Sequence, residues 1–145
     1  MFKTILLSTD GSDLSLKAIQ STVEFAKSHG SRIVGLCVEE IYPYFPNGSL
    51  EGIEGTSKFT DAIHQEAELN VKKIADLAKA GGVAVETHTV KGTSPHEEIL
   101  KSAKKYACDA IFMASHGRKG LDKLLLGSEA QKVLVHSTLP VMIFK

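Results

Sequence analysis

The sequence predicts an α/β fold, a single doubly wound domain over residues 1–145 that is built on a five-stranded parallel sheet. Five short apolar, β-branched runs alternate with segments of helical periodicity, and every run except the last is followed by a helix. Most of the runs are apolar without interruption, which is typical of parallel strands covered on both faces. Because strand–helix–strand crossovers are right-handed, this order predicts two helices on each face of the sheet.

The expected strands are short and rich in Val, Ile and Leu. They are Thr4–Thr9, Arg32–Val38, Val83–Val90, Asp109–Ser115 and Pro140–Phe144. The third run alternates instead of being apolar throughout, so we expect it at an edge of the sheet.

The first two helices are delimited by turn-forming residues. Ser12 can cap a helix that runs to Ser28, with Gly30 near its end, and a second helix covers about Ser57–Lys79. Between the second strand and this helix lies one long irregular stretch, Glu39–Ser57. A loop of this length is typical of a lid or a binding loop.

The last two helices begin with capping sequences. Ser94 is the expected N-cap of the third helix, with Pro95 at its first position and Glu97 completing Ser-x-x-Glu. The fourth is expected to open with a capping box at Ser128-Glu-Ala-Gln131 and to end near His136.

The charge and cysteine content restrict the classes of function. The chain carries 17 Lys and Arg against 17 Asp and Glu, and this balance argues against nucleic acid or an acidic membrane as a partner. No run approaches the roughly 18 apolar residues of a membrane helix, and the N-terminal apolar stretch is too brief for a signal peptide. Cys37 and Cys108 are not in a C-x-x-C arrangement. We therefore expect a cytoplasmic protein with two reduced cysteines.

The topology predicts where a ligand binds. In doubly wound sheets, ligands bind beyond the carboxyl ends of the strands, at the point where the strand order reverses. With the expected order 3-2-1-4-5, this crevice lies between the first and fourth strands. Two turns of small polar residues fall there, Ser8–Ser12 and Ala114–Gly117.

The segment that follows the fourth strand suits a phosphate group. Gly117 and Gly127 can adopt positive φ and let the backbone approach a ligand closely. Ser128 begins a helix whose free N–H groups favour an anion, and Arg118 and Lys119 can add positive charge. On these residues alone, nucleotide binding and ordinary helix chemistry both remain open.

Two further residues have alternative interpretations. Asp10 ends the first strand and can accept a hydrogen bond from a ribose hydroxyl or an adenine amine, or help to hold a divalent cation. It can also cap the first helix, although Ser12 and Asp13 are better placed for that. His96 is expected to be an exposed residue of a first helical turn. A P-loop and the Gly-x-Ser-x-Gly motif of hydrolases are both missing from the sequence.

Several segments together resemble the universal stress protein family of the single-domain type, over essentially the whole chain. They are Ile5-Leu-Leu-Ser-Thr-Asp-Gly-Ser12, Cys37-Val-Glu-Glu40, Gly92-Thr-Ser-Pro-His-Glu-Glu-Ile99, Met113-Ala-Ser-His-Gly-Arg-Lys-Gly120 and Leu139-Pro-Val-Met-Ile-Phe144. The ATP-binding branch of that family carries Gly-x2-Gly-x9-Gly-Ser/Thr. Here nine residues separate Gly117 from Gly127, Ser128 follows directly, and Ala114 replaces the first glycine.

The resemblance implies an adenine-nucleotide-binding, Rossmann-like fold that takes ATP, or AMP or ADP, with Mg²⁺. It implies that Thr9 and Asp10 contact ribose or the phosphate-bound metal, and that Val38 flanks adenine. The sugar and phosphate path would be lined by Met113, Ala114, Ser115, His116 and Gly117. Backbone N–H groups for the phosphates would come from Gly127, Ser128 and Glu129, and Ser128 would add its hydroxyl.

The resemblance also implies a homodimer in which the last strand, Val141–Phe144, meets its copy. The expected function is that of a nucleotide-dependent stress sensor or regulator. No nucleophile or general base is evident, so efficient catalysis is not expected. The alternatives are a dimeric interaction module with a vestigial nucleotide site, a weak ATP hydrolase, and an enzyme acting on an adenylated substrate with Glu39–Ser57 as its lid.

Overall fold

The computed structural model describes residues 1–41, 52–117 and 125–145, with the backbone alone for residues 52–56. Its five strands form one parallel sheet in the order β3-β2-β1-β4-β5. The strands are β1 (Thr4–Ser8), β2 (Arg32–Glu40), β3 (Val85–Gly92), β4 (Ala110–Ala114) and β5 (Val141–Phe144). The predicted fold class and strand order are confirmed, and the alternating third strand does lie at an edge.

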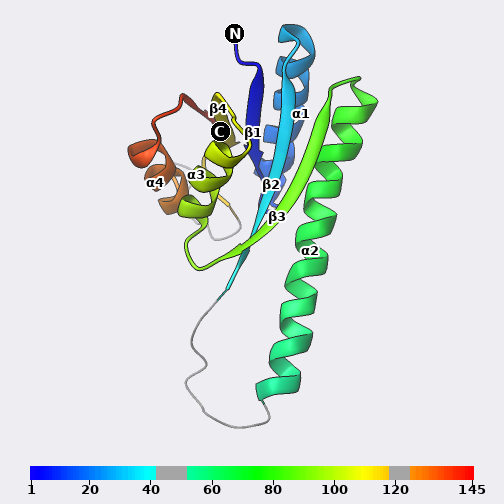
Figure 1. Ribbon diagram of the computed structural model, residues 1–145, viewed down its shortest axis with the longest axis vertical. Coiled ribbons are helices and arrows are strands. Elements are labelled where there is room, and N and C mark those ends of the chain that lie inside the picture. Colours follow the sequence, from blue (N-terminus) through cyan, green and yellow to red (C-terminus); the bar gives the residue numbers. More distant parts are fainter. Residues whose placement is uncertain (42–51, 118–124) are drawn as a thin grey trace.

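Two helices cover each face of the sheet, as predicted (Figure 1). They are α1 (Asp13–His29), α2 (Gly52–Ala80), α3 (Pro95–Lys105) and α4 (Ser128–His136). One core cluster joins Ile19 of α1 and Ile74 of α2 to Phe112 of β4. The other joins Ile99 of α3 and Val133 of α4 to Ile111, the neighbouring residue of the same strand. Successive strand residues therefore supply opposite cores, because side chains alternate across a sheet.

The stretch Glu39–Ser57 is less irregular than predicted. Its first two residues extend β2, because Glu39 and Glu40 pair in register with Lys91 and Gly92 of β3. At its other end, α2 begins at Gly52 and not at Ser57. Residues 42–51, where the lid was expected, lie outside the described part of the chain. Because α2 begins at Gly52, it projects past the carboxyl end of β2 (Figure 1).

The predicted helix starts are only partly correct. Ser12 caps α1 as expected, since its hydroxyl accepts a hydrogen bond from the Ser15 N–H at 3.2 Å. Ser94 is the N-cap of α3 but makes no side-chain capping bond, so the predicted capping box is wrong there. The second predicted box is also wrong, because the N-cap of α4 is Gly127 and Ser128 lies inside the helix.

No helix in the described ranges combines the length and the apolar character that a membrane span requires. The longest, α2, carries charged residues along its exposed side, among them Lys72 and Asp76, which form an ion pair with each other. Its apolar residues Ile74 and Ala78 are buried against the sheet instead.

Candidate functional site

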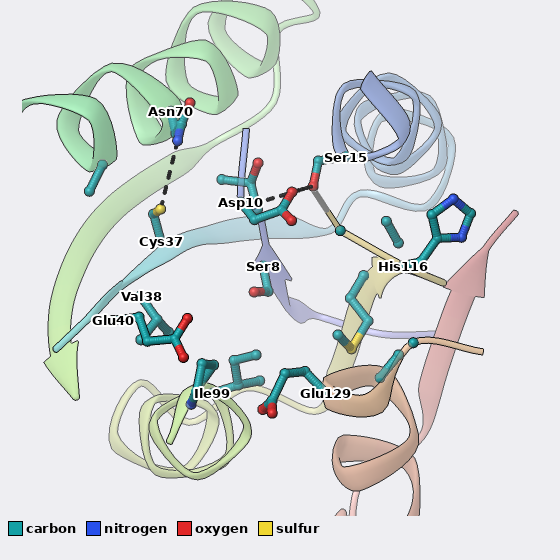
Figure 2. Close-up of a pocket in the computed structure, with 18 of the residues that line it drawn as sticks. Ser8, Asp10, Ser15, Cys37, Val38, Glu40, Asn70, Ile99, His116 and Glu129 are labelled. Carbon is teal, nitrogen blue, oxygen red and sulfur yellow. Dashed lines mark hydrogen bonds between the residues drawn. The ribbon is translucent and has the colours of Figure 1, made fainter. Parts of the chain in front are cut away.

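A cavity of about 650 Å³ opens at the carboxyl ends of β1, β2 and β4 (Figure 2). Ten of the twelve residues predicted for the site line it. They are Thr9, Asp10, Val38, Met113, Ala114, His116, Gly117, Gly127, Ser128 and Glu129. These residues are far apart in the sequence and meet because parallel strands end at the same edge of the sheet.

Of the other two predicted residues, Ser115 does not line the cavity. Ser115 is buried, and its backbone carbonyl accepts a hydrogen bond from the Gly127 N–H at 2.7 Å. Its hydroxyl lies 3.1 Å from Nδ1 of His116. Arg118, together with the Lys119 that was expected to add charge, falls outside the described residues.

The Asp10 carboxylate is held by the start of α1. Its Oδ1 accepts hydrogen bonds from the Ser12 N–H at 3.0 Å and from the Ser15 hydroxyl at 2.9 Å. On its other side, Oδ2 lies so close to Gly117 that a Cβ at this glycine would collide with it. The turn after β4 therefore packs directly on the Asp10 side chain of the turn after β1, and this packing favours glycine at position 117.

Gly127 also lies where two backbone segments come close together, the start of α4 and the turn after β4. A Cβ there would lie 3.0 Å from the Ser115 carbonyl oxygen and 3.1 Å from the His116 Cα. The φ of Gly127 is −60°, and Gly117 is not among the glycines with positive φ. The expectation of positive φ at these two glycines is thus wrong: the need for glycine comes from packing.

The first turn of α4 borders the cavity, and its N-cap, Gly127, has no side chain that could cap it. The first N–H groups of a helix have no partner within the helix and attract anions. At the start of α1, the Ser12 hydroxyl accepts a hydrogen bond from one of these N–H groups. At the start of α3, the carboxylate of Glu129 accepts one from the His96 N–H at 2.8 Å. The start of α4 is therefore the one of these three that is left for a ligand.

Glu129 connects two helices, a role that the sequence did not reveal. Besides the His96 backbone, its carboxylate contacts Nδ1 of His96 at 3.2 Å and accepts a hydrogen bond from Lys132 at 3.0 Å. Burial acts to raise the pKa of Glu129, but the bonds from Lys132 and His96 outweigh it and lower the pKa. The expectation of an exposed His96 is wrong, since this side chain is only 16% exposed.

The main part of the site that sequence reasoning missed is one face of α2. Its members recur at helical spacing and line the cavity: Phe59, Ile63, Glu66, Ala67 and Asn70. Their periodicity was visible, but it is equally expected of a helix that packs on a sheet. Only the projection of α2 beyond β2 shows that this face borders a cavity.

Carboxylates dominate the charge of the described cavity lining. Asp10, Glu40, Glu66 and Glu129 are its acidic members. No three His, Cys, Asp or Glu side chains of the described ranges are grouped to hold a metal ion. Asp10 lies against Gly117 of the turn after β4, and a single carboxylate suits Mg²⁺ when substrate phosphates supply further oxygens.

Comparison with known proteins agrees with this architecture. The model of the universal stress protein family matches residues 1–145. The universal stress protein YxiE of Bacillus subtilis is 35% identical over 150 residues, covering all of both chains. The universal stress protein MJ0531 of Methanocaldococcus jannaschii is 31% identical over 148 residues, covering 100% of this chain and 83% of its own.

Two solved structures are similar over almost the full length. The structure of MJ0577 superposes with a TM-score of 0.85 at 29% identity, covering 100% of this chain and 96% of that one. The crystal structure of a universal stress protein in complex with cAMP superposes with a TM-score of 0.65 at 25% identity, covering 98% and 95%.

Proposed function

This chain belongs to the universal stress protein family, and from that premise we propose that it binds an adenine nucleotide, ATP, in the cavity beyond β1 and β4. The observation that carries the proposal is the convergence of ten predicted residues on one cavity of about 650 Å³. That volume is within the range of small-molecule sites, roughly 300–1,000 Å³. The cAMP complex of a relative at 25% identity supports an adenine nucleotide as the ligand class.

The phosphates of the nucleotide bind at the start of α4. Gly127 and Ser128 line the cavity there, and among the described residues no side chain caps the first N–H groups of the helix. The dipole of α4 favours the negative charge. Away from this end, apolar side chains of Val38, Ile99 and Met113 offer surfaces for the nucleoside.

Mg²⁺ would be held by Asp10 together with the phosphates. The bonds from Ser12 and Ser15 fix the orientation of this carboxylate at the edge of the cavity. When bound, the ion would neutralise phosphate charge in a lining that is otherwise acidic.

The site suits a sensor or regulator better than an efficient enzyme. Ser115 and His116 are bonded to each other, but the serine is buried and does not line the cavity. A nucleophile would have to face the substrate. Nucleotide binding that changes the state of the protein is therefore our principal proposal, with slow hydrolysis of ATP as its enzymatic alternative.

A homodimer formed through β5 completes the proposal. β5 is an edge strand, and Met142 on it is 36% exposed. On the adjoining α4, Leu134 and Val135 are exposed apolar residues. An apolar edge strand is prone to pair with another chain. We place this dimer in the cytoplasm, where the buried thiols of Cys37 and Cys108 stay reduced.

The proposal is tested by denaturing the purified protein and identifying released small molecules by mass spectrometry. We expect ATP, ADP or AMP in near-stoichiometric amount, or, if the protein is purified empty, saturable heat on titration with ATP and Mg²⁺. An empty protein that gives no heat would favour the dimeric module with a vestigial site. The dimer is tested separately by light scattering of Met142→Lys, for which we expect the monomer mass.

A further inference from the structure

Asn70 of α2 places a buried amide in the cavity wall, at a position that the sequence did not single out. The residue is 4% exposed and lines the cavity. It lies beside a small apolar cluster formed by Cys37, Ala67 and Val71. Figure 2 shows Asn70 on α2, facing Cys37 of β2.

The polar groups of this amide are poorly satisfied by the protein. Within the described ranges, its hydrogen-bond contact is the one from Nδ2 to Sγ of Cys37 at 4.0 Å. Sulfur is a weak acceptor, and an asparagine side chain has two N–H donors and a carbonyl with two lone pairs. Buried polar groups are nearly always hydrogen-bonded, and because Asn70 lines the cavity, a ligand there can supply the partners that this amide lacks.

Asn70 lies away from the phosphate-binding end of the cavity. The start of α4, marked by Glu129, and the pair Asn70 and Cys37 stand on opposite sides of the site in Figure 2. A nucleotide whose phosphates are bound at α4 extends its nucleoside toward the wall formed by β2 and α2. This step rests on the proposed function.

We propose that Asn70 determines base specificity by reading the hydrogen-bonding edge of adenine. The amide oxygen accepts from the exocyclic amine, and Nδ2 donates to the neighbouring ring nitrogen. Asparagine forms this bidentate pair with adenine in other recognition systems. A purine that lacks the amine leaves the amide oxygen without a partner in either orientation of the side chain.

The experiment compares ATP with purine riboside 5′-triphosphate, which lacks the 6-amino group, by titration calorimetry with Mg²⁺. The wild-type protein should prefer ATP by about tenfold, the effect of one hydrogen bond. Asn70→Leu should weaken ATP binding by about the same factor and leave the affinity for the analogue unchanged, so that the preference disappears.

Ile63→Ala is the matched control, because Ile63 is on the same face of α2 and contributes only apolar contact. It should lower the affinities for ATP and for the analogue by the same factor, so that the ratio of the two affinities is unchanged. Asn70→Asp keeps the shape of the side chain but replaces the N–H donor, so it should also weaken the binding of ATP. This variant is used in place of Asn70→Leu if a thermal melt shows that the leucine variant does not fold.

Three results would overturn the assignment. A wild-type protein that binds both ligands equally, or an Asn70→Leu variant that keeps the preference, would show that water satisfies the amide. An Asn70→Leu variant that weakens both ligands equally would show a general packing role. A wild-type protein that binds neither ligand would instead remove the proposed function itself, and this inference with it.

Discussion

The starts of α1 and α4 occupy equivalent places in the fold but are completed in different ways. Each helix follows a strand, β1 or β4, and these strands are neighbours in the sheet. At α1, the Ser12 hydroxyl accepts from the first turn, and Asp10 accepts from Ser12. At α4, the N-cap is Gly127, and no side chain in the described part of the chain takes this role. Gly127 leaves the first N–H groups of α4 without a side-chain cap, so these groups are available to a phosphate.

The difference arises from backbone packing and not from capping propensity. Ser128 is a good N-cap type, and the sequence around it resembles a capping box. However, the Gly127 N–H is bonded to the Ser115 carbonyl at 2.7 Å, and the helix begins one residue earlier than the serine predicts. A tertiary contact has thus displaced the local signal.

The largest expected effect comes from Gly127→Val, which disrupts the start of α4 and leaves the start of α1 unchanged. Its side chain would collide with backbone atoms of Ser115 and His116, so the start of α4 must move. We expect ATP affinity to fall by about a hundredfold, close to 2.7 kcal/mol, measured by calorimetry.

The control for this variant is Gly30→Ala. Gly30 has a φ of 68° at the far end of α1, so the substitution destabilises the fold by about 1 kcal/mol without touching the cavity. Its ATP affinity should equal that of the wild type. An unchanged affinity in Gly127→Val would refute the placement of the phosphates.

Glu129→Gln is expected to loosen the link between α3 and α4. Removal of the charged acceptor for the His96 N–H should lower the free energy of unfolding by about 1 to 2 kcal/mol at pH 7. Because the folded pKa of Glu129 is lowered, its contribution is complete above the unfolded pKa of about 4.3 and is lost as the pH falls through the folded value.

Thermal melts of both proteins between pH 7 and pH 3 measure this effect. The difference in melting temperature should shrink on acidification, as Glu129 becomes protonated. A difference that stays constant with pH would mean that the charge of Glu129 does not contribute.

Ala114→Gly sharpens the comparison by restoring the glycine of the family's ATP-binding pattern. Ala114 lines the cavity at the end of β4, and its methyl group narrows the approach of a ligand to the backbone. If that methyl group weakens binding, the variant should bind ATP up to about tenfold more tightly, or 1.4 kcal/mol. Equal calorimetric affinities would show that alanine is neutral here.

Ser12→Ala should have the smallest effect, and it should lower the stability of the fold without changing ATP binding. Loss of the hydroxyl that accepts the Ser15 N–H should cost about 1 kcal/mol of unfolding free energy. ATP affinity should change by less than about twofold, because α4 and not α1 supplies the phosphate site. A large loss of affinity on calorimetry would transfer the anion site to α1.

Much of the site was predictable because its residues end strands. The expected order 3-2-1-4-5 places the turn that holds Thr9 at this edge of the sheet, whereas Val38 and Met113 were implied by the family resemblance. All three line the cavity. The contributions of Ile63 and Asn70 were not predictable, because they depend on how far α2 extends past the sheet.

The sequence by itself determined the alternation of strands and helices, the edge position of β3 and the two turns that flank the site. These follow from periodicity and turn residues, which are local properties of the chain. Only the tertiary structure decided that Gly127 is the N-cap of α4, that Glu129 caps α3 and that one face of α2 lines the cavity. Each of these depends on contacts between segments distant in sequence, whose energies outweigh local propensity when the chain packs.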